Sequence, residues 1–299
     1  MINTIQIKQE QLTNGYFKVG SGEEKILIMG SCRVCPYVEY FHQWNIRNGN
    51  RFTIYSLDPF NFNWNIKDER VDYVQSLERW ETDERMLDML KSVDIFIHEY
   101  YQNAGMFNVN SNDSSKTIYD FGMSPIKALI PLYGVGITRE SARLDICLPN
   151  FNDYFILFHD IVAFDLDIRK KAIQDYNVLG KLSEQTKKEM YQISIINITK
   201  FYNVCDRSSI PEMKEYFKEN ITTTRFWHSY NHVTKYFTLA MFWFLNDKYL
   251  NLNLSSEFWE QISKDDLFDN SFTPLSEFDV ELFGYDWGEN IVALRNKLF

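Results

Sequence analysis

Short apolar runs alternate with amphipathic segments through the first half of the chain. The runs at 26–30, 52–56 and 94–97 have the length and composition of buried strands. Residues 34–45 and 79–92, which follow or precede these runs, carry apolar positions at helical spacing. Strands that alternate with helices favour a parallel sheet covered by helices on both faces. The pattern therefore predicts an α/β fold with a parallel central sheet.

The rest of the chain is predicted to be mainly helical. Two further strands are expected at 126–131 and 154–158, and the polar stretch 103–117 is expected to form a long surface loop. Helical spacing then recurs at 165–176, 182–204, 211–219 and 232–247. Because no repeat or glycine-rich linker divides it, the chain is predicted to be a single α/β domain over 1–299. Its sheet-rich core would cover about 1–162, with a helical region over 163–299 packed on it.

Composition and charge narrow the class of protein. The 299 residues are 45% hydrophobic, which is ordinary for a soluble globular protein. A formal net charge of −10 disfavours nucleic acid as a partner, because phosphate contacts need a basic face. The apolar stretch Phe237–Leu245 is roughly half as long as the ~20 residues that a membrane span needs, so a buried helix is expected there. The N-terminus lacks the pattern of a signal peptide, and four cysteines do not make a disulfide framework, so a cytoplasmic protein is expected.

The stretch "KILIMGSCRVCPY" at 25–37 carries the first candidate chemistry. Cys32 and Cys35 form a C-x-x-C pair at an expected helix start, which is compatible with a redox dithiol. The same pair could supply half of a zinc site, but no second C-x-x-C completes it. The third interpretation uses Cys32 alone as a nucleophile, with Cys35 as a helix residue that faces the sheet. Cys32 could also be a small residue that packs at a strand end.

The nucleophile interpretation follows from the position of Cys32 after a strand. Gly30 permits a tight turn, and the helix start offers backbone N–H groups to a developing oxyanion. A nucleophilic thiol needs a base, for which histidine is the usual residue. His228 and His232 lie in "RFWHSYNHVTKYF", which is predicted to begin a helix. They could instead cap that helix, and they do not form the H-E-x-x-H metal motif, so no metal is expected.

Four segments in this order resemble the WcbI-type capsular polysaccharide biosynthesis family, which is related in architecture to SGNH hydrolases. The segments are "KILIMGSCRV" at 25–34, "SVDIFIHEYYQN" at 92–103, "LPNFNDYFILFHDI" at 148–161 and "TTRFWHSYNHVTKYF" at 223–237. The resemblance implies an SGNH-like three-layer fold and an acyltransferase that uses coenzyme A or acetyl-CoA. Its acceptor would be a surface or capsular glycan or a nucleotide-sugar precursor.

The resemblance also implies roles for individual residues. Gly30-Ser31-Cys32 occupies the Gly-Asp-Ser position of SGNH enzymes, which makes Cys32 the nucleophile and His232 the base. Ser229 stands where those enzymes have an acidic partner, so His228 or Asn231 is expected to orient His232. The expected catalytic residues are Cys32, His232, Ser31 and His228. The residues expected to bind coenzyme A are Gly30, Arg33, Gln102, Asn103, His159 and Asn231.

When Cys32 or an acceptor hydroxyl attacks the acyl group, its carbonyl oxygen becomes an oxyanion. The backbone N–H groups of Cys32 and Arg33 would hold this oxyanion, helped by Gln102 or Asn103. Arg33 could alternatively contact a phosphate of coenzyme A. His159 and Asp160 would line the acceptor side.

Several alternatives stay open at this stage. The acyl group could pass through Cys32, or a sugar hydroxyl that His232 deprotonates could attack the thioester directly. An esterase or thioesterase and a non-catalytic binding protein fit the same fold, and a homo-oligomer is allowed. Residues 255–299 are expected to form a wrapping segment or an interface without chemistry.

Overall fold

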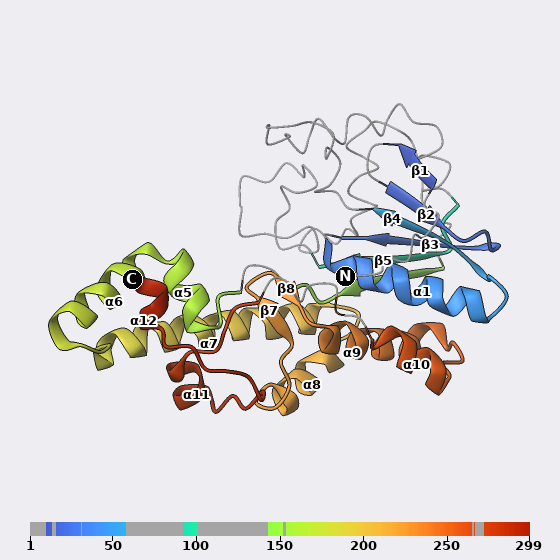
Figure 1. Ribbon diagram of the computed structural model, residues 1–299. Coiled ribbons are helices and arrows are strands. Elements are labelled where there is room, and N and C mark those ends of the chain that lie inside the picture. Colours follow the sequence, from blue (N-terminus) through green and yellow to red (C-terminus); the bar gives the residue numbers. More distant parts are fainter. Residues whose placement is uncertain are drawn as a thin grey trace. The chain divides into compact units, whose positions relative to one another are not determined.

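The computed structural model describes residues 10–13, 16–30, 32–57, 92–100, 143–151, 154–264, 266 and 272–299 (Figure 1). The loop at 103–117, the strand at 126–131 and all but the last residue of the helix predicted at 79–92 lie outside these residues. Ser31, Gln102 and Asn103 also lie outside them, and of Cys32 only the backbone is described.

The chain forms two compact units. The first comprises residues 1–148 together with 253–262, and the second comprises 149–252 together with 263–299. The sheet belongs to the first unit, and the helices that were predicted for the second half belong mainly to the second.

In its described residues, the first unit is built on a six-stranded, mainly parallel sheet (Figure 1). Its strands, in spatial order, are β1 (Glu10–Thr13), β2 (Tyr16–Val19), β4 (Phe52–Leu57), β3 (Glu24–Met29), β5 (Ile95–Glu99) and β6 (Leu144–Leu148). The last four are parallel to one another, β2 pairs antiparallel with β4, and β1 pairs antiparallel with β2 at the edge. The structure thus confirms a mixed α/β fold with a mainly parallel sheet, and the SGNH-like assignment stays a prediction.

Three of the predicted strands correspond to β3, β4 and β5. Their apolar runs are continuous because both faces of a parallel sheet are covered, and Ile26, Leu27 and Ile28 are fully buried. After β3, a 3₁₀ turn (Cys32–Val34) leads into α1 (Cys35–Arg47), which matches the helix predicted at 34–45.

Helix α1 covers one face of the sheet. Phe41 and Trp44 on α1 pack against Phe52 of β4, with ring centroids 5.8 and 5.3 Å apart. Helix α10 (Ser256–Ile262) contacts α1, and the indole Nε1 of Trp44 donates a hydrogen bond to the backbone oxygen of Asn253. Residues 253–262 therefore return to the first unit, where α10 packs against α1.

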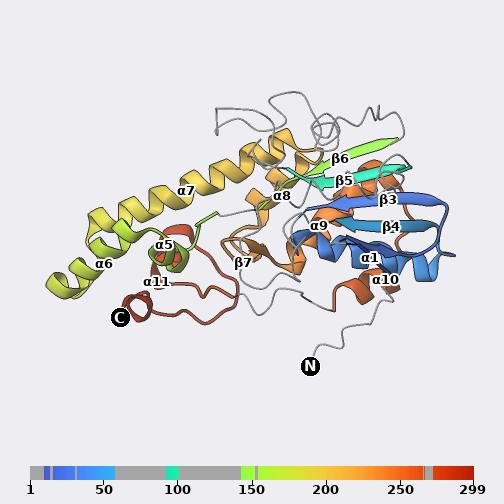
Figure 2. The same cartoon turned by 90° about the horizontal axis from the view of Figure 1, so that it is seen from above.

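The second unit consists mainly of helices (Figure 2). They are α5 (Phe158–Phe164), α6 (Leu166–Leu179), α7 (Glu184–Arg207), α8 (Glu212–Asn220), α9 (Lys235–Leu245), α11 (Glu277–Phe283) and α12 (Arg295–Leu298). Local sequence sets several ends: Asp165 and Ser183 cap α6 and α7 through their side chains, and Gly180 ends α6 with a φ of 71°. A five-residue π-helix (Asn246–Leu250) follows α9.

One predicted element in this unit is wrong, and a second begins later than predicted. Residues 154–157 form no strand, and α5 begins at Phe158, whose N–H donates to Asp279 Oδ1 at 3.0 Å. This cap comes from a residue far along the chain, so local pattern could not indicate it. The helix predicted at 232–247 begins only at Lys235, because residues before it pair as a hairpin of β7 (Trp227–Ser229) and β8 (His232–Val233).

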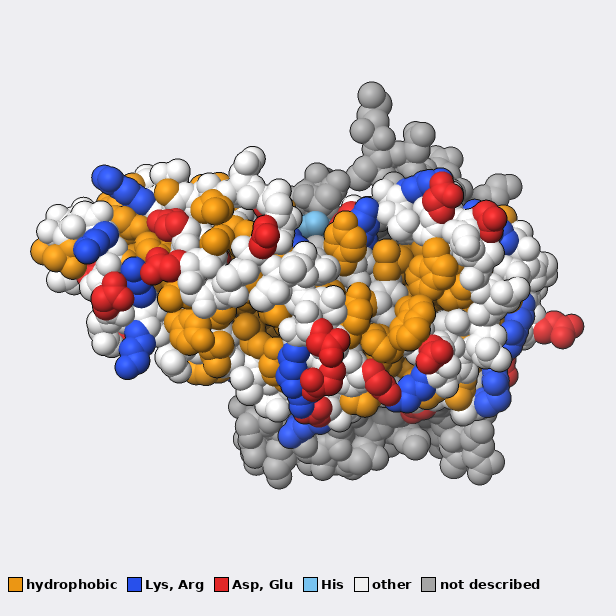
Figure 3. Space-filling view, turned by 90° about the horizontal axis from the view of Figure 1, so that it is seen from below, with side chains coloured by type: hydrophobic (Ala, Val, Ile, Leu, Met, Phe, Trp, Pro, Cys, Tyr) orange, Lys and Arg blue, Asp and Glu red, His pale blue; other side chains and the backbone are white. Residues whose placement is uncertain are grey.

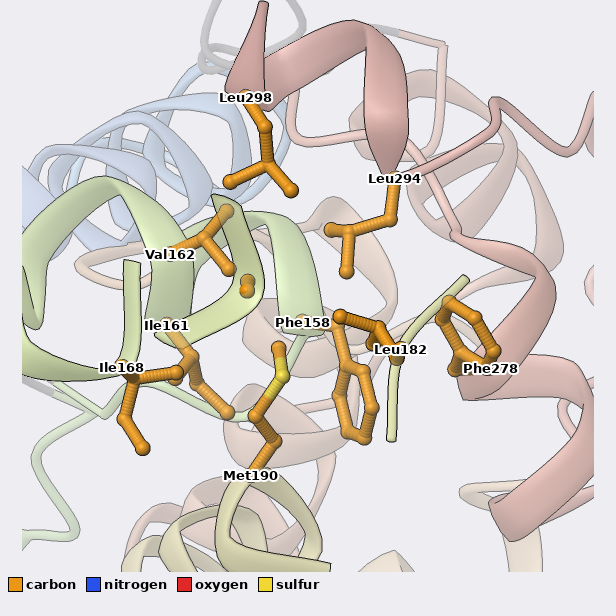
Figure 4. Packing of buried hydrophobic residues seen from close by; sticks show 10 residues of the cluster. Phe158, Ile161, Val162, Ile168, Leu182, Met190, Phe278, Leu294 and Leu298 are labelled. Carbon is orange, nitrogen blue, oxygen red and sulfur yellow. The ribbon is translucent and has the colours of Figure 1, made fainter. Parts of the chain in front are cut away.

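Buried apolar side chains from α5, α6, α7, α11 and α12 form one cluster of the second unit (Figure 4). Phe158, Ile161 and Met190 are fully buried, and Leu294 joins the cluster from the C-terminal segment. Residues 272–299 therefore contribute to the core of the unit, beyond the wrapping role that was predicted for them.

The described residues on the face shown in Figure 3 carry hydrophobic side chains in patches between charged ones. Val178, Trp243 and Phe164 are among the exposed large apolar residues.

Among the described residues, no helix is both long and apolar enough to cross a membrane. The stretch Phe237–Leu245 forms part of α9, and Phe237, Met241 and Leu245 are buried, as the sequence predicted.

Candidate functional site

The carboxyl ends of β3 and β5 define the candidate site. The chain leaves β3 through α1 to β4 on one side, whereas β5 lies on the other side of β3. In open α/β sheets, ligands bind beyond the strand ends at such a reversal of strand order. Gly30 and Cys32 follow β3 at this point, and Glu99 ends β5.

A buried ion pair connects the two strand ends. Arg33 Nε donates to Glu99 Oε1 at 2.9 Å, and Nη2 donates to Oε2 at 3.4 Å. Arg33 is 7% exposed and Glu99 4% exposed, so the two-point contact is shielded from water. The predicted contact of Arg33 with a phosphate of coenzyme A stays a prediction. In the structure, the guanidinium holds the turn that contains Cys32.

Gly30 is required by close packing at the same turn. A Cβ atom at this position would lie 2.3 Å from Val34 Cγ1 and 2.9 Å from the Cγ and Oε2 atoms of Glu99. The absent side chain therefore makes room for the carboxylate that binds Arg33. The sequence predicted a tight turn at Gly30, but it gave no indication of Glu99.

The backbone places Cys32 at the first position of the 3₁₀ turn that leads into α1, and Cys35 begins α1 itself. Cys35 is exposed, whereas the sequence predicted that it faces the sheet. Among the described residues, no group of three or more His, Cys, Asp or Glu side chains could hold a metal ion.

The histidines at 228 and 232 lie on the β7–β8 hairpin of the second unit, and the predicted helix start is wrong there. His232 is half-buried, and its Nδ1 lies 3.4 Å from Ser229 Oγ. Ser229 in turn donates to Asn231 Oδ1 at 3.2 Å. Ser229 thus lies beside the His232 ring. The resemblance to SGNH enzymes implies an acidic partner at this sequence position in those enzymes. Cys32 and His232 belong to different units, so their pairing stays a prediction.

His228 has a different partner, which sequence reasoning missed. Its Nε2 lies 2.9 Å from Asp266 Oδ2, and the same oxygen accepts a hydrogen bond from the backbone N–H of Lys235 at 3.1 Å. The backbone oxygen of His228 accepts from Thr273 N at 2.7 Å. Asp266 lies in the stretch that was expected to carry no chemistry, and no local motif connects it to His228.

His159 is buried on α5, where its Nε2 donates to the backbone oxygen of Val292 at 3.1 Å. Burial lowers the pKa of His159, which favours the neutral ring. This hydrogen bond connects α5 to the C-terminal segment, and the predicted role of His159 toward a ligand stays a prediction.

Asp160, the next residue, is a buried ionisable group. Thr273 Oγ1 donates to its Oδ1 at 2.9 Å, and its Oδ2 has no hydrogen-bond partner within the described part of the chain. Burial raises the pKa of Asp160 to about 7, against the opposing effect of the Thr273 hydrogen bond. Burial likewise raises the pKa of Asp279 to about 6.

Replacing Asp160 with asparagine is expected to stabilise the protein at pH 8. The folded protein keeps the Asp160 proton up to about pH 7, whereas the unfolded chain loses it near pH 3.8, so stability falls between these values. Above pH 7 the charged carboxylate costs on the order of 2–4 kcal/mol, which the neutral amide avoids. Urea unfolding at pH 5 and pH 8 measures the difference. Asp167→Asn, at a side chain that is 88% exposed, is the control, and an unchanged pH difference in Asp160→Asn would contradict the prediction.

The fold and the strand ends together define an open α/β protein with a candidate ligand site at the carboxyl edge of a mainly parallel sheet. No family model matches the chain, and no curated protein matches it. A solved structure that matches is native WcbI, described as a polysaccharide biosynthesis enzyme and as lacking a disulfide bond between coenzyme A and a cysteine. The TM-score is 0.43 at 9% identity, over 84% of this chain and 80% of that one. A likeness this distant carries no argument about the function of this chain.

Proposed function

We propose that this protein transfers an acyl group from a coenzyme A thioester to a hydroxyl group of a surface polysaccharide or its sugar precursor. The proposal depends on one observation, the position of Cys32 directly after β3, where the order of the parallel strands reverses. A residue at this position is suited to meet a ligand that binds beyond the sheet edge. The sequence motifs around Cys32 and His232 support the choice of acyl transfer.

The turn around Cys32 is suited to hold a reacting carbonyl group. Its backbone N–H groups open the helical segment that continues into α1, and such groups stabilise a developing oxyanion. Arg33 is fixed by Glu99, and Gly30 is packed against the same carboxylate. A turn fixed in this way keeps its donors in place before the substrate binds.

In the covalent route, the Cys32 thiolate attacks the thioester carbonyl, the acyl–sulfur bond to coenzyme A breaks, and the coenzyme leaves as a thiolate. His232 then takes the proton of the acceptor hydroxyl as that oxygen attacks the acyl-cysteine, and the bond between the acyl group and Cys32 breaks to restore the thiolate. His232 gives up its proton, which balances the one that the coenzyme thiolate takes up. Ser229, at 3.4 Å from Nδ1, would orient the His232 ring. In the direct route, the hydroxyl attacks the thioester without an acyl-enzyme.

A thermal-shift titration with coenzyme A tests the proposal. A ligand that binds only the folded state stabilises it by about 2.7 kcal/mol at a hundred times its Kd, so a rise in Tm that saturates with concentration is expected. Cys35→Ser should respond as the unmodified chain does, because Cys35 is not placed in the mechanism. Adenosine 3′,5′-bisphosphate separates recognition of the nucleotide from recognition of the pantetheine arm.

The contrary outcomes are equally specific. Turnover of an aryl acetate without any effect of coenzyme A would replace the transferase with an esterase. The absence of both responses in folded protein would contradict an acyl-transferring enzyme altogether.

A further inference from the structure

Cys147, the third cysteine of the first unit along the chain, lies in a setting that the proposed mechanism does not use. Cys147 of β6 is the register partner of His98 on the neighbouring strand β5, and Asp145 is the partner of Phe96. Alternate side chains along a strand point to the same face, so Cys147, Asp145 and His98 share one face of the sheet. Glu99, and with it the Arg33 pair, lies on the other face. The three residues thus form a separate cluster.

The hydrogen bonds of His98 identify the charge state of its ring. Nε2 lies 3.1 Å from Asp145 Oδ1, and Nδ1 lies 3.1 Å from the backbone oxygen of Glu99. A carboxylate and a carbonyl oxygen both accept hydrogen bonds, so both contacts are satisfied only when both ring nitrogens carry a proton. Burial lowers the pKa of His98, but Cys147 and Asp145 outweigh it and raise that pKa to about 9. His98 is therefore a buried cation.

The surroundings strengthen the effect of that cation on the neighbouring sulfur. His98 is 1% exposed, and the Phe96 ring stacks on it with the centroids 4.7 Å apart. Charges interact more strongly where water is excluded. The cation lies beside Cys147, its register partner on β6, and such electropositive surroundings are typical of reactive cysteines.

The other described cysteines supply internal references. Cys205 is 0% exposed on α7, and burial raises the pKa of its thiol, which makes it unreactive. Cys35 is exposed. Cys147 is 8% exposed and differs from Cys205 chiefly in its His98–Asp145 partners.

We propose that Cys147 is a nucleophilic thiol and a site of modification by low-molecular-weight disulfides, activated by the His98 cation that Asp145 holds in place. The Cys147 sulfur attacks one sulfur of the reagent, a new sulfur–sulfur bond forms, and the disulfide bond of the reagent breaks. The released half leaves as a thiolate and takes up the proton that Cys147 has lost. One disulfide is thereby exchanged for another. This inference is independent of the proposed acyl transfer.

The test uses the full chain with Cys32→Ser and Cys35→Ser, which leaves Cys147 and Cys205 as its cysteines. The protein is mixed with 4,4′-dithiodipyridine, release of 4-thiopyridone is followed by absorbance, and the modified peptide is identified by mass spectrometry. We expect a fast phase of one equivalent at Cys147 and slow labelling of Cys205. His98→Gln should slow the fast phase by about tenfold or more, since it removes the cation.

Labelling of Cys205 also reports whether each variant is folded. If His98→Gln unfolds the chain, both cysteines label quickly, and Asp145→Asn provides the test instead, because that side chain is 32% exposed. A slower fast phase in Asp145→Asn, with Cys205 still protected, supports the proposal. Equal rates at Cys147 and Cys205, or an unchanged Cys147 rate in a folded His98 or Asp145 variant, would overturn it.

Discussion

If the protein catalyses the proposed acyl transfer through Cys32, replacing Cys32 with alanine is expected to reduce that activity by roughly 10³-fold or more, because removal of a covalent nucleophile removes the route through the acyl-enzyme. The residue stands directly after β3, at the reversal of strand order. Alanine is small and suits a helical turn, so the variant should fold as the parent does. The measurement is release of free coenzyme A from acetyl-CoA in the presence of a glycan acceptor. Mass spectrometry of the parent should detect an acetyl group on Cys32.

Cys35→Ser is the matched control, because Cys35 lies three residues later and is exposed. Its activity should stay within about twofold of the parent, as is usual for surface substitutions away from a site. If Cys32→Ala keeps most of its activity, the direct attack of the acceptor on the thioester replaces the covalent route. If Cys35→Ser abolishes activity and Cys32→Ser has no greater effect, the redox interpretation of the C-x-x-C pair is favoured.

The second large effect is expected at the buried ion pair. Arg33→Met should lower the free energy of unfolding by about 3–5 kcal/mol, because it leaves the Glu99 carboxylate buried without its cation. Urea unfolding followed by circular dichroism measures the loss. The double variant Arg33→Met with Glu99→Leu should recover much of it, since two apolar side chains can replace a buried pair at little cost.

An exposed ion pair of the same unit provides the comparison. Arg51 Nη2 lies 2.6 Å from Glu24 Oε2, and the Arg51 side chain is 46% exposed. Arg51→Met should change stability by about 0–1 kcal/mol, because water screens such pairs. Equal losses in Arg33→Met and Arg51→Met, or no recovery in the double variant, would mean that the Arg33–Glu99 contact is not what stabilises the turn.

The central strands could be predicted from sequence because they are continuous apolar runs. β3 and β5 consist of such runs, and the structure places them where the pattern indicated. β6, with the sequence "LDICL", interrupts its apolar run with Asp145, and β2 is only four residues long. Apolar patterns this short are difficult to distinguish from loop sequences. These strands are specified by their pairing with neighbours more than by their own residues.

The sequence predicted the candidate site only where its residues lie close together along the chain. The strand–turn–helix pattern located Gly30, Cys32 and Arg33 correctly in the fold. Glu99 and Asp266 were missed because each meets its partner through the tertiary fold, and neither belongs to a motif. The aromatic-rich segment around His228 and His232 was interpreted as a helix start, whereas β7 and β8 pair across a tight turn there.

The division of the chain has a consequence for how the protein can be taken apart. The polypeptide passes from one compact unit to the other after Leu148, after Leu252 and after Ile262. A fragment that stops at Leu148 lacks α10 and leaves bare the part of α1 that α10 contacts. The first unit is therefore made of two segments that are separated in the amino-acid sequence. It becomes complete only after most of the second unit has been translated. Insertion or exchange of whole units during evolution would have to preserve this returning segment.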